Sequence, residues 1–283
     1  MLKVATVTTT DIEYLLHDIA VGKTAATVAT KPRGLARVRG GKATAARVVR
    51  LLGAVFSYAI KHKMRGDNPV RGVTQFEDGQ RRRRLSGREY RALGAALTKI
   101  EKTGMWPAAV AATRFAALTG WRTGEALGLR WSEIDLEHRT VFLPDTKTGK
   151  SLRPLSNAAI AVLRNQSCLG ELVFPATRGN GDLIMSGYKK LFRKIAEVGN
   201  LPRDLTPNSL RHSFASVAAD QPPVGAGLSD VTIGALIGHK GRTITSSRYI
   251  HVADAVLLAA ADAVADRIGD LMGYRRQEPR VKS

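Results

Sequence analysis

The chain has 283 residues, of which 44% are hydrophobic, so it can form one large or two ordinary globular domains. Its 44 Lys and Arg against 24 Asp and Glu leave a net charge of +20, which predicts a polyanionic partner, DNA or RNA rather than a membrane surface. No apolar run is long enough to span a membrane, there is no signal-peptide pattern, and Cys168 is the single cysteine. These features exclude an internal disulfide and a Cys-rich zinc site, and they indicate a cytoplasmic, DNA-associated protein without a membrane partner.

The first part of the chain is predicted to be a small, strongly basic helical domain, residues 1–78. Helices are expected over Thr10–Ile19 and Thr44–Lys63, the second from an apolar stripe that ends at the breaker cluster R-G-D-N-P. Between them lies the basic segment Lys31–Lys42, either a solvated loop or a DNA-contacting element, and the charge excess favours DNA. Residues 1–84 carry 17 basic and 6 acidic side chains, against 27 and 18 in the rest, so both parts should contact DNA. The DNA-contacting candidates here are Lys31, Arg33, Arg37, Arg39, Lys42 and Arg47.

A polar stretch, Q-F-E-D-G-Q-R-R-R-R-L-S, predicts a linker over residues 79–85. Its arginines are either a solubilising run or a basic tether between two DNA-facing domains, and the tether is favoured; they are Arg81, Arg82, Arg83 and Arg84. Residues 86–283 then form a second, mostly helical domain, in which Arg139–Leu155 reads as strand, turn and strand. Helices are expected from Ser86 and over Pro107–Leu118, Asn157–Asn165, Ser186–Val198, Pro207–Ala219, Ser229–Ile237 and Ala253–Met272. The expected fold is mainly α with a small antiparallel β-sheet (α+β).

Four short stretches of this second domain carry candidate chemistry. In T-G-W-R-T-G-E-A-L-G-L-R-W, Gly120 and Gly124 should allow close backbone approach, and Glu125 is placed one helical turn from Arg122, where it can hold the guanidinium. The second stretch, T-P-N-S-L-R-H-S-F-A-S, is expected to begin a helix with a capping Thr and a Pro. Its apolar residues recur at core-facing spacing, which places Arg211 beside packed structure, and a charge there needs an anion. The other two stretches are L-I-G-H-K and T-S-S-R-Y-I-H-V, with His239 and Tyr249. Each alone has a purely structural explanation; their order and spacing in a basic protein favour a shared function.

Together these stretches resemble the tyrosine recombinase (phage integrase) family. The first resembles the family's first arginine motif, L-R-H-S-F-A-S its second, and L-I-G-H-K with S-S-R-Y-I-H its histidine and nucleophile motifs. The resemblance runs over nearly all of residues 85–273 and implies an integrase-type catalytic domain. It is looser in the first domain, which would be the helical core-binding domain, where it rests on the region Tyr58–Val70 ending in D-N-P-V.

The resemblance implies a site-specific DNA recombinase that needs neither a metal nor ATP. Two arginines, Arg122 and Arg211, would hold the scissile phosphate, with His239 as a third donor. Tyr249 would be the nucleophile and form a phosphotyrosyl link to the DNA 3′ end. Lys147, in the D-T-K-T-G-K turn, matches the general acid, with Lys150 as the alternative. The family acts as a tetramer on paired sites, and an accessory direction factor is a further expected partner; no cofactor is expected.

Two features depart from the family pattern. Asn208 stands where most members have a His, and an amide can donate a hydrogen bond to phosphate but cannot accept a proton at neutral pH; His212 and His251 are possible substitutes. The N-terminal part is also short, which predicts either a simple recombinase or a fragment of a longer one.

Several alternatives stay open from the sequence. The Asn at position 208 supports a recombinase-derived DNA-binding protein with weak or no strand exchange. A type IB topoisomerase shares the nucleophile chemistry, but the residue sequences of the motifs favour a recombinase. The apolar helix Ala253–Met272 is either a subunit-docking element or an intramolecular packing helix.

Overall fold

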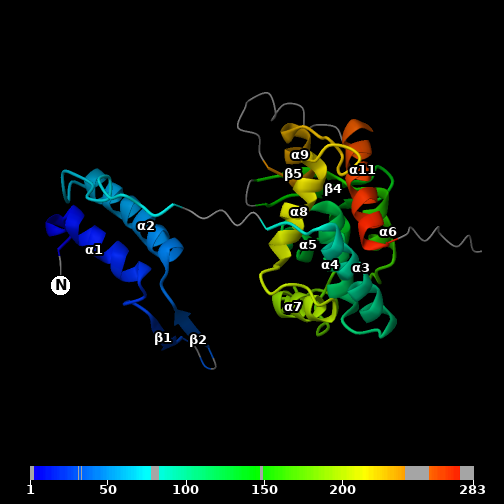
Figure 1. Ribbon diagram of the computed structural model, residues 1–283, viewed down its shortest axis with the longest axis horizontal. Coiled ribbons are helices and arrows are strands. Elements are labelled where there is room, and N and C mark those ends of the chain that lie inside the picture. Colours follow the sequence, from blue (N-terminus) through cyan, green and yellow to red (C-terminus); the bar gives the residue numbers. More distant parts are fainter. Residues whose placement is uncertain are drawn as a thin grey trace, which may run out of the picture. The chain divides into compact units, whose positions relative to one another are not determined.

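The computed structural model describes residues 3–30, 32, 34–77, 83–146, 149–239 and 255–274. The chain forms two compact units, residues 1–81 and 82–283, and each has its own hydrophobic core (Figure 1).

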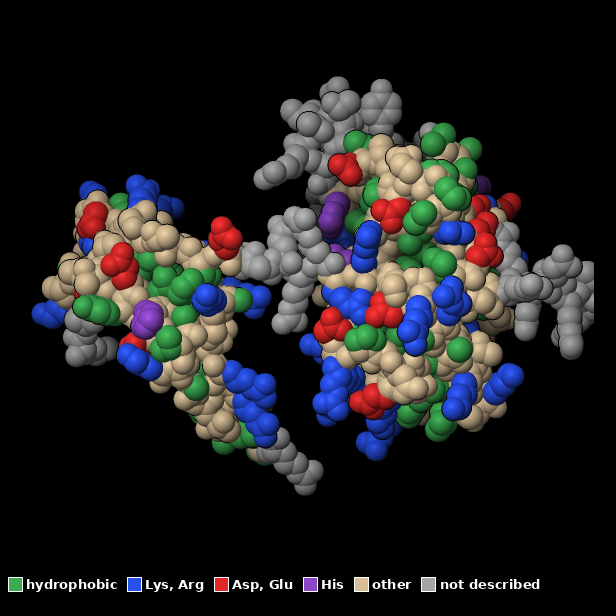
Figure 2. Space-filling view, in the orientation of Figure 1, with side chains coloured by type: hydrophobic (Ala, Val, Ile, Leu, Met, Phe, Trp, Pro, Cys, Tyr) green, Lys and Arg blue, Asp and Glu red, His purple; other side chains and the backbone are tan. Residues whose placement is uncertain are grey.

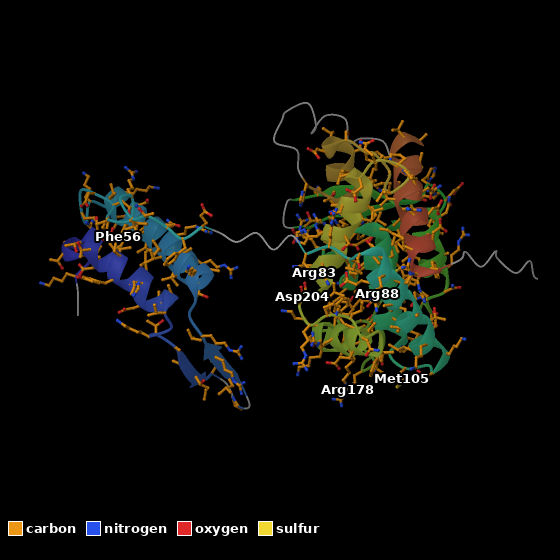
Figure 3. The ribbon with its side chains drawn as sticks, in the orientation of Figure 1. Phe56, Arg83, Arg88, Met105, Arg178 and Asp204 are labelled. Atoms are coloured by element: carbon orange, nitrogen blue, oxygen red, sulfur yellow. The ribbon has the colours of Figure 1, made fainter. Side chains whose placement is uncertain are left out.

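The first unit is built on two packed helices, α1 (Thr9–Ala20) and α2 (Lys42–Lys61), preceded by a short 3-10 helix, η1 (Val4–Thr6). Both helices begin and end within two residues of the predicted positions. Thr8 and Asp11 cap the start of α1 reciprocally. The core lies between the two helices, and Phe56 is its largest side chain (Figure 3).

Between these helices the chain forms a β-hairpin, which corrects the interpretation of the basic segment as a loop. Strands β1 (Ala26–Ala29) and β2 (Leu35–Val38) pair antiparallel, with Ala26 opposite Val38. The hairpin extends beyond the ends of α1 and α2 (Figure 1). Its base is fixed where the Gly41 N–H donates to Ile19 O at 2.9 Å. Every described residue of both strands is exposed or half-buried, so no alternation between a buried and a solvated face marked these strands in the sequence.

The second unit surrounds helix α4 (Pro107–Thr119), which is buried along almost its whole length. Its many alanines let neighbouring helices approach closely. Those that contact it are α3 (Gly87–Lys102), α6 (Asn157–Arg164), α7 (Tyr188–Val198), α8 (Pro207–Ala219) and α11 (Ala255–Met272). These helices, with α9 (Asp230–Ile237) against α8, agree with the predicted segments to within a few residues.

A three-stranded antiparallel sheet packs beside these helices. It is formed by β3 (Ile134–Asp135), β4 (Thr140–Leu143) and β5 (Ser151–Pro154) in the order β3-β4-β5. Two short elements lead into it, α5 (Thr123–Leu127) and the 3-10 helix η2 (Trp131–Glu133). The predicted strand, turn and strand are therefore present as β4 and β5, and β5 contacts both α9 and α11.

Helix α11 belongs to the core of its own unit. Val264 and Ile268 are fully buried, and the helix packs against α3, α4, α6 and α8. This packing favours the intramolecular alternative for α11 over the subunit-docking one.

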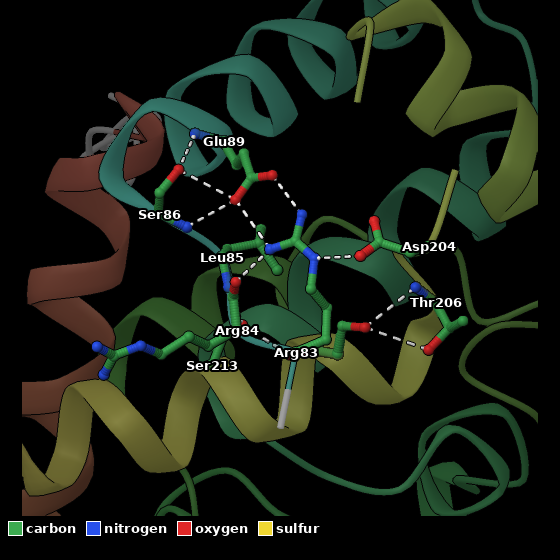
Figure 4. A network of polar contacts seen from close by, with 9 residues as sticks. Arg83, Arg84, Leu85, Ser86, Glu89, Asp204, Thr206 and Ser213 are labelled. Carbon is green, nitrogen blue, oxygen red and sulfur yellow. Dashed lines mark hydrogen bonds and ion pairs between the residues drawn. The ribbon is translucent and has the colours of Figure 1, made fainter. Parts of the chain in front are cut away.

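The start of the second unit is fastened to the loop before α8 and to α8 itself (Figure 4). Arg83 forms an ion pair with Glu89 and donates from Nε to an oxygen of Asp204 at 3.0 Å. The Leu85 N–H donates to Ser213 Oγ at 2.7 Å. Arg83 and Asp204 come from segments far apart in sequence and lie side by side (Figure 3). The last residues of the predicted linker are therefore anchored on the second unit.

Candidate active site

Arg122 is held at the start of α5 by a carboxylate one helical turn away. Glu125 accepts hydrogen bonds from Arg122 Nη1–H at 2.7 Å and from the Arg122 backbone N–H at 3.2 Å. One carboxylate therefore both caps the helix and fixes the position of the guanidinium. The pair that the spacing predicts is present. The Arg122 side chain is still 26% exposed, which leaves it accessible to a ligand.

Arg211 is buried on α8 beside Leu210 and Phe214, as its spacing predicts. Its Nη1 donates to two backbone carbonyls, Gly120 O at 3.0 Å and Ile237 O at 2.7 Å. Its Nη2 is also buried, and among the described residues it has no hydrogen-bond partner. A buried, charged donor without an acceptor costs free energy, so this atom marks a place for an anion.

The end of α9 joins both arginines to His239. Gly238 ends this helix in the left-handed conformation with φ +70°, and the His239 N–H donates to Gly234 O at 2.8 Å. Arg122 Nη1 reaches Gly238 O at 3.4 Å, while Arg211 binds the preceding carbonyl. His239, a predicted site residue, therefore comes directly after the two backbone carbonyls that Arg122 and Arg211 contact.

Arg153 is a fourth charged member of this cluster, and no sequence motif pointed to it. It lies on β5 with no exposed surface, and its nearest carboxylate is Glu125, at 3.4 Å from Nη2. Its guanidinium lies 5.3 Å from the centre of the Trp121 ring.

The cluster is strongly positive. Three guanidinium groups (Arg122, Arg153 and Arg211) face one carboxylate (Glu125), which leaves two positive charges. Burial, followed by the charge of Arg122, lowers the pKa of Arg211 to about 10, so it stays charged at neutral pH. Partial burial and the same arginines lower the pKa of His239, which keeps this imidazole neutral at pH 7. An anion is the ligand that such a site favours.

Gly120 and Gly124 differ in what they contact. Gly120 has φ +64°, and a Cβ there would lie 2.6 Å from the Phe214 ring, so the predicted close approach is present. At Gly124 an added Cβ would meet no atom of the described residues within 4 Å, so the predicted close approach is not present in that part of the chain.

The structure describes three of the six other predicted residues. Lys147, Tyr249 and His251 lie outside the described residues. The alternative general acid, Lys150, is exposed just before β5. Asn208 is exposed in the first turn of α8, and its side chain makes no hydrogen bond within the described part of the chain. His212 is exposed whereas Arg211 is buried, so the two side chains do not share an environment.

A family model described as the phage integrase family matches residues 83–255, more than half of the chain and the whole segment that forms this cluster. The chain belongs to the phage integrase family. This agrees with the tyrosine recombinase resemblance of its motifs.

Curated relatives of this integrase-family chain are similar over about half of it. The shufflon-specific DNA recombinase of Escherichia coli is 34% identical over 148 residues, which cover 51% of this chain and 35% of that protein. Tyrosine recombinase XerC of Mesorhizobium japonicum is 33% identical over 172 residues, 56% of this chain and 53% of that protein. The chain thus spans about half the length, or less, of these relatives.

Solved integrase structures share the fold. A lambda integrase dimer bound to a COC′ core site superposes with a TM-score of 0.61 at 24% identity, covering 85% of this chain and 81% of that one. The Tn1549 transposon integrase in complex with circular intermediate DNA also gives a TM-score of 0.61, at 19% identity, covering 92% of this chain and 86% of that one. The predicted fold class is confirmed.

The first unit of this family member has a basic surface along the hairpin and α2. Of its predicted DNA-contacting residues, all those that the structure describes are exposed, namely Arg37, Arg39, Lys42 and Arg47. The sequence has no Asp or Glu between Asp18 and Asp67 to offset them. Lys and Arg side chains follow one side of the hairpin in Figure 2. Lys31 and Arg33 lie outside the described residues.

The arginines of the linker have different surroundings. Arg83 is engaged by Glu89 and Asp204, and Arg84 reaches Asp220 at 3.5 Å. The structure therefore shows that Arg83 is anchored within its own unit, and its DNA-contacting role remains a prediction. The other two arginines of the run, Arg81 and Arg82, lie outside the described residues.

A basic groove beside α7 is a second feature that was not predicted from the sequence. It has a volume of about 550 Å³ and reaches the start of α8. Its basic lining residues are Lys189, Lys190, Arg193, Lys194 and Arg203. The sequence K-K-x-x-R-K in the predicted helix Ser186–Val198 could have indicated this groove, because its spacing places four cations near one another on the helix surface.

Two further findings concern metal-ligand groups and membrane-spanning helices. Among the described residues, no group of three or more His, Cys, Asp or Glu could hold a metal ion. One described helix, α2, is long and apolar enough to cross a membrane by length and composition alone. That helix carries Arg47 and Arg50 and buries one side against α1, which is the pattern of an amphipathic helix in a globular unit.

Proposed function

We propose that the protein is a site-specific DNA recombinase that cleaves and rejoins DNA through a covalent 3′-phosphotyrosine on Tyr249. The observation that carries the proposal is the buried Nη2 of Arg211, which has no hydrogen-bond partner among the described residues and lies beside Arg122 in a cluster with two excess positive charges. A phosphodiester is the anion that a basic, integrase-family protein encounters along DNA.

The charge of the cluster suits the transition state better than the ground state. A phosphodiester carries one negative charge, and attack by a phenolate oxygen produces a pentacoordinate phosphorus with two. The two excess positive charges match the second state, so the stabilisation grows as the reaction proceeds. The neutral His239 adds an N–H donor without adding a further charge.

The proposed cleavage is a balanced displacement at phosphorus. The Tyr249 phenol gives up its proton to water and its oxygen attacks phosphorus, the bond between phosphorus and the 5′ oxygen breaks, and the new phosphotyrosyl bond retains the bond energy for rejoining. The 5′ oxygen takes a proton from Lys147, or from Lys150 as the alternative donor. Asn208 lies three residues before Arg211 on α8, and it would contact the phosphate without taking the tyrosine proton. Neither ATP nor a metal ion enters this scheme.

The basic surfaces of both units supply the DNA-binding part of the proposal. In the first unit these are the hairpin and the start of α2, through Arg37, Arg39 and Arg47; in the second it is the α7 groove. Each phosphate that they neutralise steepens the salt dependence of DNA affinity. Assembly as a tetramer on paired recombination sites and a direction factor remain part of the proposal, and a related fold, lambda integrase, has been solved as a tetramer bound to a Holliday junction.

A second function is favoured by Asn208. Without a proton acceptor there, the protein would be a recombinase-derived DNA-binding protein with weak or no strand exchange. A nicked suicide substrate, built on a site selected from a random duplex pool, separates the two. The recombinase forms a covalent protein–DNA band, whereas binding without a band contradicts the enzyme and supports the alternative. Relaxation of any supercoiled plasmid without a specific site would instead indicate a topoisomerase.

A further inference from the structure

Arg153 is a fully buried arginine at the centre of the proposed active site, and none of the assigned roles uses it. It has no exposed surface, and its Nε donates to Ser151 Oγ at 2.8 Å. Its Nη1 and Nη2 lie 3.5 and 3.4 Å from the two oxygens of Glu125. Burying a guanidinium costs free energy, and a buried ion pair that is replaced as a whole by well-packed apolar side chains often loses no stability. Stability alone therefore does not account for a charged pair at this position.

We propose that Arg153 is a positioning residue that sets Arg122 and His239 in place for the scissile phosphate. The inference rests on the proposed function. It concerns how the phosphate-binding groups are held, and two sets of contacts carry it: one through Glu125 to Arg122, the other through Gly238 to His239.

The first set of contacts runs through Glu125. This carboxylate, with 9% of its side chain exposed, lies between Arg122 on α5 and Arg153 on β5. Burial acts to raise the pKa of Glu125, but the charge of Arg153 and the hydrogen bond from Arg122 together lower it below its ordinary value. The charge of Arg153 is the largest single cause of this lowering, and Arg122 acts in the same direction. The two arginines together therefore favour the ionised form of Glu125, which holds Arg122 Nη1.

The second set of contacts lies under the loop that carries His239. A Cβ at Gly238 would lie 1.9 Å from Arg153 Nη2 and 2.0 Å from its Cζ, so the guanidinium packs directly against the Gly238 backbone. The same guanidinium lies 5.3 Å from the centre of the Trp121 ring. Trp121 precedes Arg122, and Gly238 precedes His239. The Arg153 guanidinium thus contacts both segments that carry the phosphate donors.

The chain offers a matched control in Arg114. This arginine is also buried, at 6% exposure, binds Glu101 at 2.8 and 2.9 Å, and lies 4.7 Å from the Tyr274 ring centre. None of its contacts belongs to the proposed active site. Arg153→Met and Arg114→Met therefore each remove a buried arginine that pairs with a glutamate and lies beside an aromatic ring, one inside and one outside the site, although Glu101 is more exposed than Glu125.

The experiment measures single-turnover formation of the covalent band at saturating protein, together with DNA affinity and the thermal unfolding midpoint. We expect Arg153→Met to slow cleavage on the order of 10²-fold, the effect of misplacing a reacting group by about 1 Å. Arg114→Met should lower the unfolding midpoint but leave cleavage unchanged. Equal cleavage by the two variants, with both folded, would overturn the proposal.

The pH profile and a double variant test the route through Glu125. The groups around this carboxylate are Arg122, Arg153, Arg211 and His239, so removal of Arg153 takes away one of its cations and leaves the burial. The acid limb of the pH profile of the cleavage rate should move to higher pH in Arg153→Met. In Arg153→Lys, which keeps the charge, it should return to its native position. Combining Arg153→Met with Glu125→Gln should slow cleavage by less than the product of the two single effects, because the route through Glu125 is shared, whereas fully additive effects contradict this route.

A readout without DNA keeps this inference separate from the proposed function. In protein labelled with ¹⁵N-arginine, the Nε–H signal of Arg122, identified by its loss in Arg122→Lys, should shift in Arg153→Met and not in Arg114→Met. An unshifted signal contradicts the positioning role even if the native protein cleaves DNA. A shifted signal supports that role, and absence of a covalent band from native protein then counts against the proposed function alone.

Discussion

Arg211→Lys is the substitution whose effect can be worked out most directly from the structure. Arg211 uses Nη1 for the carbonyls of Gly120 and Ile237, at 3.0 and 2.7 Å, and keeps Nη2 without a partner in the described part of the chain. A lysine has one nitrogen. It can take the place of Nη1 and satisfy the two carbonyls, or it can approach the position of Nη2, but it cannot do both.

The expected magnitude follows from the removal of one donor. If the lysine satisfies the carbonyls, stability changes little, because no buried acceptor is left without its partner. The transition state then has one preorganised phosphate donor fewer, which costs about 2.7–4 kcal/mol of barrier, roughly a 10²-fold to 10³-fold slower reaction. DNA affinity should change far less, since many phosphate contacts share it.

The assay is single-turnover cleavage of the nicked suicide substrate at saturating protein, with DNA affinity and the unfolding midpoint measured in parallel. A folded Arg211→Lys that cleaves within a few-fold of the native rate would refute the reasoning, because Nη2 would then not serve the transition state. A tenfold or greater loss of affinity with unchanged cleavage at saturation would assign the residue to DNA binding instead.

Three further predictions concern other parts of the chain. Asn208→His should speed cleavage at unchanged DNA affinity if the native site lacks a base, and slower cleavage would show that the site depends on the amide. The Arg83 ion pair and the Ser86 cap lower the pKa of Glu89 to about 2, against an ordinary 4.5, so its contribution to stability is present above about pH 4.5 and disappears towards pH 2; in Glu89→Gln the unfolding midpoint should depend less on pH across that window, and an unchanged dependence contradicts the anchor. Replacing Arg37 and Arg39 by Gln should reduce the slope of log affinity against log salt by about 1.8, or about 0.9 for each phosphate that is no longer neutralised, and an unchanged slope excludes a phosphate-binding role for these arginines.

The helices of this chain are predictable from local signals. Ser86 and Glu89 form the capping box that their spacing indicates, and Pro107 stands at the first position of a helix that is buried almost all round. The clustering of Arg122, Glu125, Arg211 and His239 could be expected because each belongs to a long motif of one family. Such motifs fix both the element that carries a residue and its neighbours.

The features that escaped prediction depend on contacts distant in sequence. Arg153 stands between Leu152 and Pro154 in a short strand, where nothing local distinguishes a buried arginine from a solvated one. Arg83 reads as part of a charge run because its partner Asp204 is 121 residues away. The hairpin was missed for a different reason: β1 and β2 have no buried face, so the alternation that identifies a half-buried strand is missing.

The most direct test of the proposed function is covalent capture at Tyr249. Native protein, Tyr249→Phe and Arg211→Lys would be incubated with the nicked suicide substrate, and the covalent product digested and sequenced by mass spectrometry. We predict a 3′-phosphonucleotide on the peptide that contains Tyr249, no covalent product from Tyr249→Phe, and slow product formation by Arg211→Lys. Native protein that binds the site tightly without forming any covalent product would contradict the recombinase function, and a product that persists in Tyr249→Phe would contradict the choice of nucleophile.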